Sequence, residues 1–102
     1  MTRIPFVKMS GAGNDFVVID NRDSILPHEL TDFLRKICQR RMSIGADGVL
    51  LVEDSDLADF KMRYFNSDGN EVETCGNGAR CISRFAYLNG ITLHKMRFET
   101  KV

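Results

Sequence analysis

The amino-acid sequence predicts an α+β fold, with a mixed, mostly antiparallel sheet and two helices. Short segments of alternating or continuous apolar residues predict strands, and turns rich in glycine, asparagine and aspartate separate them. Two further segments repeat their apolar residues with the period of a helix. The chain has 102 residues, of which 43% are hydrophobic and 27% charged, a composition typical of one small globular domain.

Six segments are expected to form strands, and most of them are joined by short turns. The first two flank a loop that contains Gly11 and Gly13, so they are expected to form a hairpin whose loop is longer than the tightest kind. Asp68 and Gly69 lie at the centre of a second hairpin turn. The predicted strands are residues 4–9, 16–20, 49–53, 60–65, 71–74 and 95–102.

The first helix is expected over residues 29–41. Its apolar residues recur at intervals of three and four, which predicts one buried stripe along the helix. Cys38 lies on this stripe, so we expect a buried, unreactive thiol. The stripe consists of Leu30, Phe33, Leu34, Ile37 and Cys38.

The second helix is expected over residues 78–88. Asn77 is a suitable N-cap residue, and Gly90 is suitable for ending the helix. Arg80 and Arg84 are the charged residues of this segment, and its other side chains are largely apolar. We therefore expect this helix to be buried on most sides.

The composition argues against several classes of partner. Acidic and basic residues balance at 14 each, so charge gives no reason to expect nucleic acid or an anionic membrane as a partner. No apolar segment has the length of a signal peptide or a membrane span, which makes the cytoplasm the expected location. The three cysteines form no Cys-x-x-Cys pair, and both histidines lie far from them, so we expect reduced thiols and no metal site.

The segment around Cys75 carries the chemistry. A predicted strand ends at this thiol, and the second helix follows almost at once. The unpaired N–H groups and the positive dipole end of a helix start attract anions. They are expected to lower the pKa of the Cys75 thiol and to bind a carboxylate or a phosphate.

Three reactions are open to a thiolate beside a bound anion. Acyl transfer would need a histidine base, and neither His28 nor His94 lies in a known catalytic-cysteine signature. Redox exchange would need a resolving cysteine, and Cys81, six residues along a helix, is too far for an unstrained disulfide. Proton abstraction beside a carboxylate needs only the thiolate, a bound anion and exclusion of water, so it requires the fewest further groups.

Four segments resemble the diaminopimelate epimerase family in order and spacing: residues 8–16, 45–48, 65–72 and 75–81. The resemblance implies two similar domains, each a sheet wrapped around a central helix. It also implies a cofactor-independent isomerase that interconverts LL- and meso-diaminopimelate on the route to lysine. In that family two cysteines face opposite sides of the substrate α-carbon, one removing and one delivering a proton.

Carried over to this chain, the resemblance makes Cys75 one of the two catalytic cysteines. It implies that Asn14 and Asn66 bind the amino-acid substrate. It further implies that Gly76 and Asn77 meet the substrate α-carboxylate at the start of the helix. Each asparagine also has a purely structural reading: Asn77 as an N-cap, Asn66 as a hairpin-turn residue and Asn14 as a left-handed turn residue.

This chain departs from the family pattern in two ways, which affect the expected substrate contacts and the expected pair of catalytic cysteines. Some members have a ligand-contacting glutamine where this chain has Gly48. The family chain is also more than twice as long, and its second cysteine lies in the other half. We therefore expect residues 1–102 to be an N-terminal domain truncated at its C-terminal end, which needs the missing half of the enzyme as a partner. Cys81 cannot replace the second cysteine, because it lies on the same helix.

Other hypotheses remain open. A proline racemase-like isomerase is one, although those enzymes typically carry histidine after the Cys-Gly pair, where this chain has Asn77. A second is a non-catalytic fragment that binds amino-acid carboxylates or a partner half. A third is a homodimer in which Cys75 of each copy supplies one base.

Overall fold

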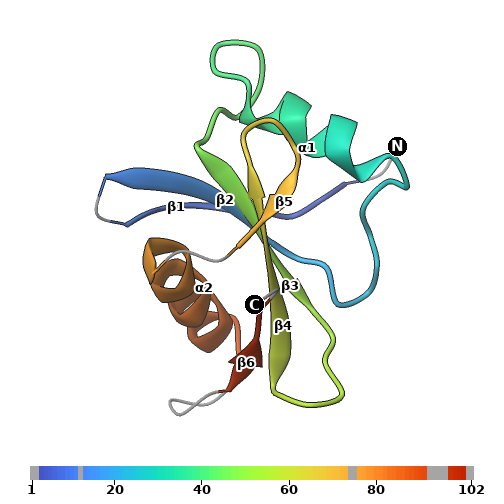
Figure 1. Ribbon diagram of the computed structural model, residues 1–102, viewed down its shortest axis with the longest axis vertical. Coiled ribbons are helices and arrows are strands. Elements are labelled where there is room, and N and C mark those ends of the chain that lie inside the picture. Colours follow the sequence, from blue (N-terminus) through green and yellow to red (C-terminus); the bar gives the residue numbers. More distant parts are fainter. Residues whose placement is uncertain (1–2, 12, 74–75, 92–96, 101–102) are drawn as a thin grey trace.

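The computed structural model describes residues 3–11, 13–73, 76–91 and 97–100, and it confirms the predicted α+β class (Figure 1). Its sheet has the order β1-β2-β3-β4-β5, and β6 also pairs with β4. The β2–β3 and β4–β6 pairs are parallel, and the other three pairs are antiparallel. The strands are Val7–Gly11 (β1), Asn14–Asp20 (β2), Gly48–Glu53 (β3), Phe60–Asn66 (β4), Glu71–Val72 (β5) and Phe98–Glu99 (β6).

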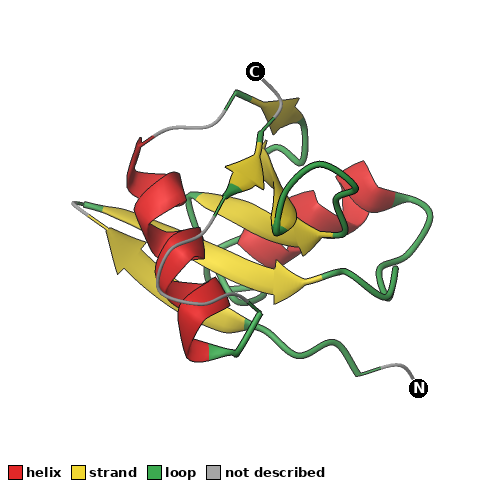
Figure 2. Ribbon diagram, turned by 90° about the horizontal axis from the view of Figure 1, so that it is seen from below, coloured by secondary structure: helices red, strands yellow, loops and turns green. Residues whose placement is uncertain are grey.

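Two helices cover opposite faces of the sheet (Figure 2). Helix α1 spans Leu30–Cys38 and connects the parallel strands β2 and β3, which need such a crossover connection. Helix α2 spans Gly76–Leu88 and lies in the angle between β1–β2 and β4–β6 (Figure 1). None of the helices in the described ranges is long and apolar enough to span a lipid bilayer.

The two faces of the sheet form two apolar cores. Successive side chains of a strand point to opposite faces. In β2, Phe16 and Val18 therefore pack toward α2, whereas Val17 and Ile19 pack toward α1. The same alternation in β3 explains why both central strands are continuous apolar runs, as expected for strands buried on two sides.

The first hairpin differs from the sequence prediction. Gly11 pairs with Asn14, so only positions 12 and 13 separate the paired residues. The expectation of a longer loop is therefore wrong, and β1 begins at Val7 rather than at residue 4. Gly13 has a φ of 94°, a left-handed conformation that favours glycine. Strand pairing across this turn thus sets the register of β1, which the apolar pattern alone did not reveal.

Both helices have different ends from those predicted. Helix α1 ends at Cys38 rather than at residue 41, because Gln39 takes an extended conformation. The N–H groups of Gly45 and Ala46 then donate to the last carbonyls of the helix, at Ile37 and Cys38. The helix C-terminus is thereby satisfied by the chain that returns to the sheet.

Helix α2 begins at Gly76, so Asn77 lies within its first turn and the N-cap prediction is wrong. The expectation that this helix is buried on most sides is also wrong, because Arg84, Tyr87 and Leu88 are exposed. The curved sheet covers one side of α2, and that side carries its buried residues. Of the last predicted strand, β6 covers Phe98–Glu99, and residues 95, 96, 101 and 102 lie outside the described residues.

The turn between β4 and β5 provides a test of the packing around α1. Gly69 has a φ of 85°, and a Cβ at this position would collide with the Thr31 carbonyl in the first turn of α1. Gly69→Ala should therefore lower the free energy of unfolding by about 3 kcal/mol or more, since overpacking adds to backbone strain. Chemical denaturation of the purified protein measures this loss.

Gly90→Ala is the matched control for this prediction. Gly90 has a φ of 70°, and among the described residues no atom beyond its chain neighbours lies within 4 Å of a Cβ placed there. This variant should show the backbone strain alone, which costs about 1–2 kcal/mol. Equal losses in the two variants would contradict close packing of the turn on α1.

Candidate active site

Two of the predicted substrate-binding residues meet where the β1–β2 hairpin contacts the start of α2. Asn77 Nδ2 donates a hydrogen bond to Asn14 Oδ1 at 3.0 Å, although 63 positions separate these residues in the sequence. Both side chains are half-buried. The structure therefore brings together residues that the sequence could relate only through the family resemblance.

The hairpin approaches the helix closely because Gly11 has no side chain. A Cβ at Gly11 would lie 3.1 Å from Cys81 Sγ and 3.4 Å from the carbonyl oxygen of Asn77. A larger residue would thus push the helix start away from β1 and β2. Gly11 therefore serves the packing of α2, whereas Gly13 serves the geometry of the turn.

Gly76 is the first residue of α2 and is exposed. N–H groups in the first turn of a helix have no partner within the helix, and the dipole is positive there. This end of α2 lies beside the Asn14 and Asn77 amides. The arrangement can bind a carboxylate between backbone and side-chain N–H donors.

Asn66 lies at the same end of the sheet but two strands away from β2. It pairs with Gly48 of β3, which in turn pairs with Phe16 of β2. The N–H of Asn66 donates to the Asn70 carbonyl, and its own carbonyl accepts from the N–H of Gly69. The backbone of Asn66 therefore closes the β4–β5 hairpin, and its exposed side chain lies at this end of the sheet.

Gly48 has no room for the glutamine of some family members. A Cβ at this position would lie 2.7 Å from the Phe65 carbonyl oxygen and 2.7 Å from Cε1 of Tyr64. Glutamine here would require displacement of the adjoining strand or of the tyrosine ring. The tyrosine thus fills the space above Gly48 in this chain.

The three cysteines differ in what the structure shows of them. Cys75 lies outside the described residues, directly before Gly76 in the sequence, so its lowered pKa stays a prediction. Cys38 is buried against the sheet, as predicted, and burial raises the pKa of its thiol to about 11. Cys81 is 5% exposed and belongs to the core between α2 and the sheet.

Comparisons with known proteins agree with the resemblance. A model of the diaminopimelate epimerase family matches residues 6–102. The chain belongs to the diaminopimelate epimerase family. The diaminopimelate epimerase of Aquifex aeolicus is 50% identical over 104 residues, covering 93% of this chain and 37% of the relative. That of Archaeoglobus fulgidus is 47% identical over 100 residues, covering 96% of this chain and 36% of the relative.

This chain spans about a third of the length of these curated relatives. Solved structures show that the fold recurs in other proteins. A crystal structure of methylitaconate-delta-isomerase matches with a TM-score of 0.75 at 16% identity, covering 97% of this chain and 55% of that protein. A phenazine biosynthesis protein of the PhzF family from Bacillus anthracis matches with a TM-score of 0.67 at 23% identity, covering 96% and 32%. At these identities the likeness shows a shared fold.

Sequence reasoning missed a cluster of charged residues behind Asn14. Asp15 Oδ1 and Oδ2 accept hydrogen bonds from the Arg40 guanidinium at 2.9 and 3.2 Å. Arg40 also donates to Asp47 Oδ1 at 3.3 Å, and Lys8 Nζ lies 3.4 Å from Asp15. The available signal was that both aspartates fall within segments of family resemblance, directly after Asn14 and directly before Gly48.

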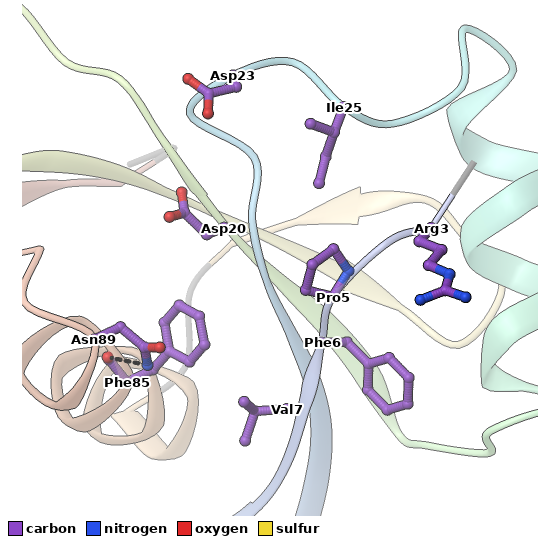
Figure 3. Close-up of a pocket in the computed structure, with 9 residues that line it drawn as sticks. All are labelled: Arg3, Pro5, Phe6, Val7, Asp20, Asp23, Ile25, Phe85 and Asn89. Carbon is purple, nitrogen blue, oxygen red and sulfur yellow. Dashed lines mark hydrogen bonds between the residues drawn. The ribbon is translucent and has the colours of Figure 1, made fainter.

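One described cavity is separate from this epimerase-family site. It measures about 390 Å³ and lies between the N-terminal segment, the end of β2 and the end of α2 (Figure 3). Phe85 and Asn89 line it from the helix, and Arg3 and Phe6 line it from the N-terminal segment. None of the predicted site residues that the structure describes lines this cavity. Among the described residues, no three His, Cys, Asp or Glu side chains gather in a group that could hold a metal ion.

The charged cluster around Asp15 predicts that the stability of the fold depends on pH. The hydrogen bond from Arg40 holds the pKa of Asp15 well below its ordinary value of 3.8. Such a carboxylate stabilises the fold above pH 3.8, and this contribution is lost as the pH falls through the lower folded-state pKa. Asp15→Asn should therefore cost about 1 kcal/mol near neutral pH, a small value because Arg40 is exposed.

Unfolding measured at several pH values checks this prediction. The difference between the native sequence and Asp15→Asn should narrow as the pH falls below 3.8. Arg40→Gln should remove part of the same dependence, because it removes the main cause of the low pKa. A difference that stays constant over the acidic range would contradict the assigned ion pair.

Proposed function

We propose that the protein carrying this chain interconverts LL- and meso-diaminopimelate without a cofactor, in the biosynthesis of lysine. Membership of the diaminopimelate epimerase family over residues 6–102 carries this proposal. Cys75 is assigned the role of one of two proton-transferring groups, and Asn14, Asn66, Gly76 and Asn77 are assigned to substrate binding. The curated relatives named above favour this reaction over the proline racemase-like alternative.

The site geometry supports proton transfer beside a bound carboxylate. Removal of the α-proton shifts negative charge into the neighbouring carboxylate of the substrate. Backbone N–H groups at the start of α2 and the Asn14 and Asn77 amides form a group of donors for that charge. Each well-placed donor to a developing oxyanion contributes about 3 kcal/mol to a rate enhancement.

A complete two-base reaction requires a second proton-transferring group. Cys38 lies in the core on the α1 face of the sheet, and Cys81 lies in the core beneath α2. Both thiols are buried, so neither is accessible to a substrate. We therefore propose that residues 1–102 form an N-terminal domain and that the remaining part of an epimerase provides the second cysteine. The cytoplasm remains the predicted location.

The role of Cys75 predicts a specific loss of activity. In the complete protein, Cys75→Ala should abolish both net epimerisation and exchange of the α-proton with solvent, because the proton-abstracting thiolate is gone. Incubation of diaminopimelate in deuterated water, followed by mass spectrometry and chiral analysis, measures both. Near-normal turnover in this variant would show that Cys75 is not a catalytic base.

Cys38→Ala is the control for this experiment. It also removes one thiol, but from the core between the sheet and α1. It should change stability while leaving turnover within about twofold, as expected for independent sites. A similar loss of activity in both variants would point to a general effect of removing a cysteine.

The chain by itself separates the remaining hypotheses. Residues 1–102 alone should give no net epimerisation, because one of the two required groups is absent. Exchange without epimerisation would indicate one working thiol. Epimerisation by a species that sediments as a dimer would favour the homodimer hypothesis, in which each copy supplies Cys75. A folded monomer without exchange would favour a non-catalytic fragment.

A further inference from the structure

We propose that Asp47 is a positioning residue, which fixes the orientation of the Asn14 amide and, through it, that of Asn77. The activity measured below rests on the proposed function, whereas the contacts that suggest this role are independent of it. Asp47 lies between α1 and β3, outside the residues assigned to the substrate.

A continuous chain of side-chain hydrogen bonds passes through the candidate site. The Arg80 guanidinium donates to Asn77 Oδ1. Asn77 Nδ2 donates to Asn14 Oδ1 at 3.0 Å, and Asn14 Nδ2 donates to Asp47 Oδ2 at 3.4 Å. The chain thus joins the first turn of α2, the β1–β2 hairpin and the loop before β3.

The residues at the two ends of this hydrogen-bond series, Arg80 and Asp47, determine which atom of each amide donates and which accepts. A guanidinium only donates hydrogen bonds, an ionised carboxylate only accepts them, and an amide can do either. Asp47 therefore faces the Asn14 nitrogen, which leaves the Asn14 oxygen toward Asn77. Arg80 likewise requires the oxygen of Asn77. A reversed Asn14 amide would oppose its oxygen to the Asp47 carboxylate.

Asp47 is itself held from two sides. The Asp15 N–H donates to Asp47 Oδ2 at 3.0 Å, and the Asp47 N–H donates to Asp15 Oδ1 at 2.9 Å. The Arg40 guanidinium binds the other oxygen of Asp47 and both oxygens of Asp15. This reciprocal arrangement holds the carboxylate in place before any ligand binds.

A fixed amide direction matters for binding an anion. Each amide nitrogen of Asn14 and Asn77 carries two N–H groups, and one of them donates to the next side chain in the hydrogen-bond series. The second N–H of each nitrogen is the donor that we assign to a substrate carboxylate. If an amide turned over, it would present an oxygen to the carboxylate, and attraction would become repulsion.

A double-mutant cycle tests this role in the complete protein. Asp47→Ala should lower kcat/KM by about tenfold or more, as small misplacements of binding groups do. In an Asn14→Ala background the same substitution should change kcat/KM by less than about twofold, because Asp47 acts through Asn14. Asp47→Asn retains one acceptor oxygen, so it should retain more activity than Asp47→Ala. Equal losses in both backgrounds would overturn the proposal.

Asp59→Ala provides the matched control. The Asp59 carboxylate accepts the N–H of Arg97 at 2.7 Å and thus also holds a backbone segment, but at the opposite end of β4. This variant should leave kcat/KM within about twofold, since its site is distant. A loss as large as that of Asp47→Ala would mean that removing any hydrogen bond from a side chain to the backbone is enough to lower kcat/KM.

Nuclear magnetic resonance provides a readout that does not need turnover. In complete protein labelled with nitrogen-15 at asparagine, Asp47→Ala should shift the side-chain amide signals of Asn14, and Asp59→Ala should not. Unmoved Asn14 signals would overturn the proposal even if activity changed. If the unmodified protein showed no epimerisation, the proposed function would fail, and these spectra would still test the role of Asp47. If Asp47→Ala did not fold, the same comparison would use Asp47→Asn.

Discussion

The close contact between the β1–β2 hairpin and the start of α2 is the constraint on which the candidate site depends. It is possible because Gly11 presents only backbone to the helix, and a Cβ there would crowd Cys81 and the Asn77 carbonyl. The contact joins Asn14 to Asn77 across 63 sequence positions. It therefore converts two separate turns into one surface that carries backbone and side-chain N–H groups.

The rest of the fold holds this contact in place. Strands β2 and β3 are buried on both faces, so α1 and α2 must both pack on the sheet before either strand is shielded from water. The polar residues of the site lie at the strand ends, where Asn14 begins β2 and Asn66 ends β4. The apolar interior thus provides stability, and the ends of its strands are free to carry chemistry.

Local sequence patterns predicted the central strands and α1. The features that they did not predict depend on contacts between residues far apart in the sequence. The apolar runs of β2, β3 and β4 and the stripe of α1 appear directly in the sequence. The start of β1 depends on the Gly11–Asn14 pair, and the cluster of Asp15 with Asp47 joins residues 32 positions apart. The periodic spacing of apolar residues in a sequence does not indicate such contacts. The site residues themselves were accessible only because four short segments together resemble one family.

The charged cluster behind Asn14 places two carboxylates, Asp15 and Asp47, near a site proposed to bind a carboxylate. Two carboxylates beside a site for a carboxylate ligand would by themselves repel it. Here Arg40 and Lys8 lie against Asp15, and Arg40 also reaches Asp47, while Arg80 lies at the other end of the amide chain. Three cations thus accompany two anions, so the cluster can orient the amides without making the site negative. An uncharged acceptor in place of Asp47 would impose the direction less strictly, because an amide or a hydroxyl can also donate. The charge of Asp47 therefore imposes the direction of the Asn14 amide from one end, as Arg80 imposes that of Asn77 from the other, and the neighbouring cations make the charge of Asp47 compatible with binding an anion.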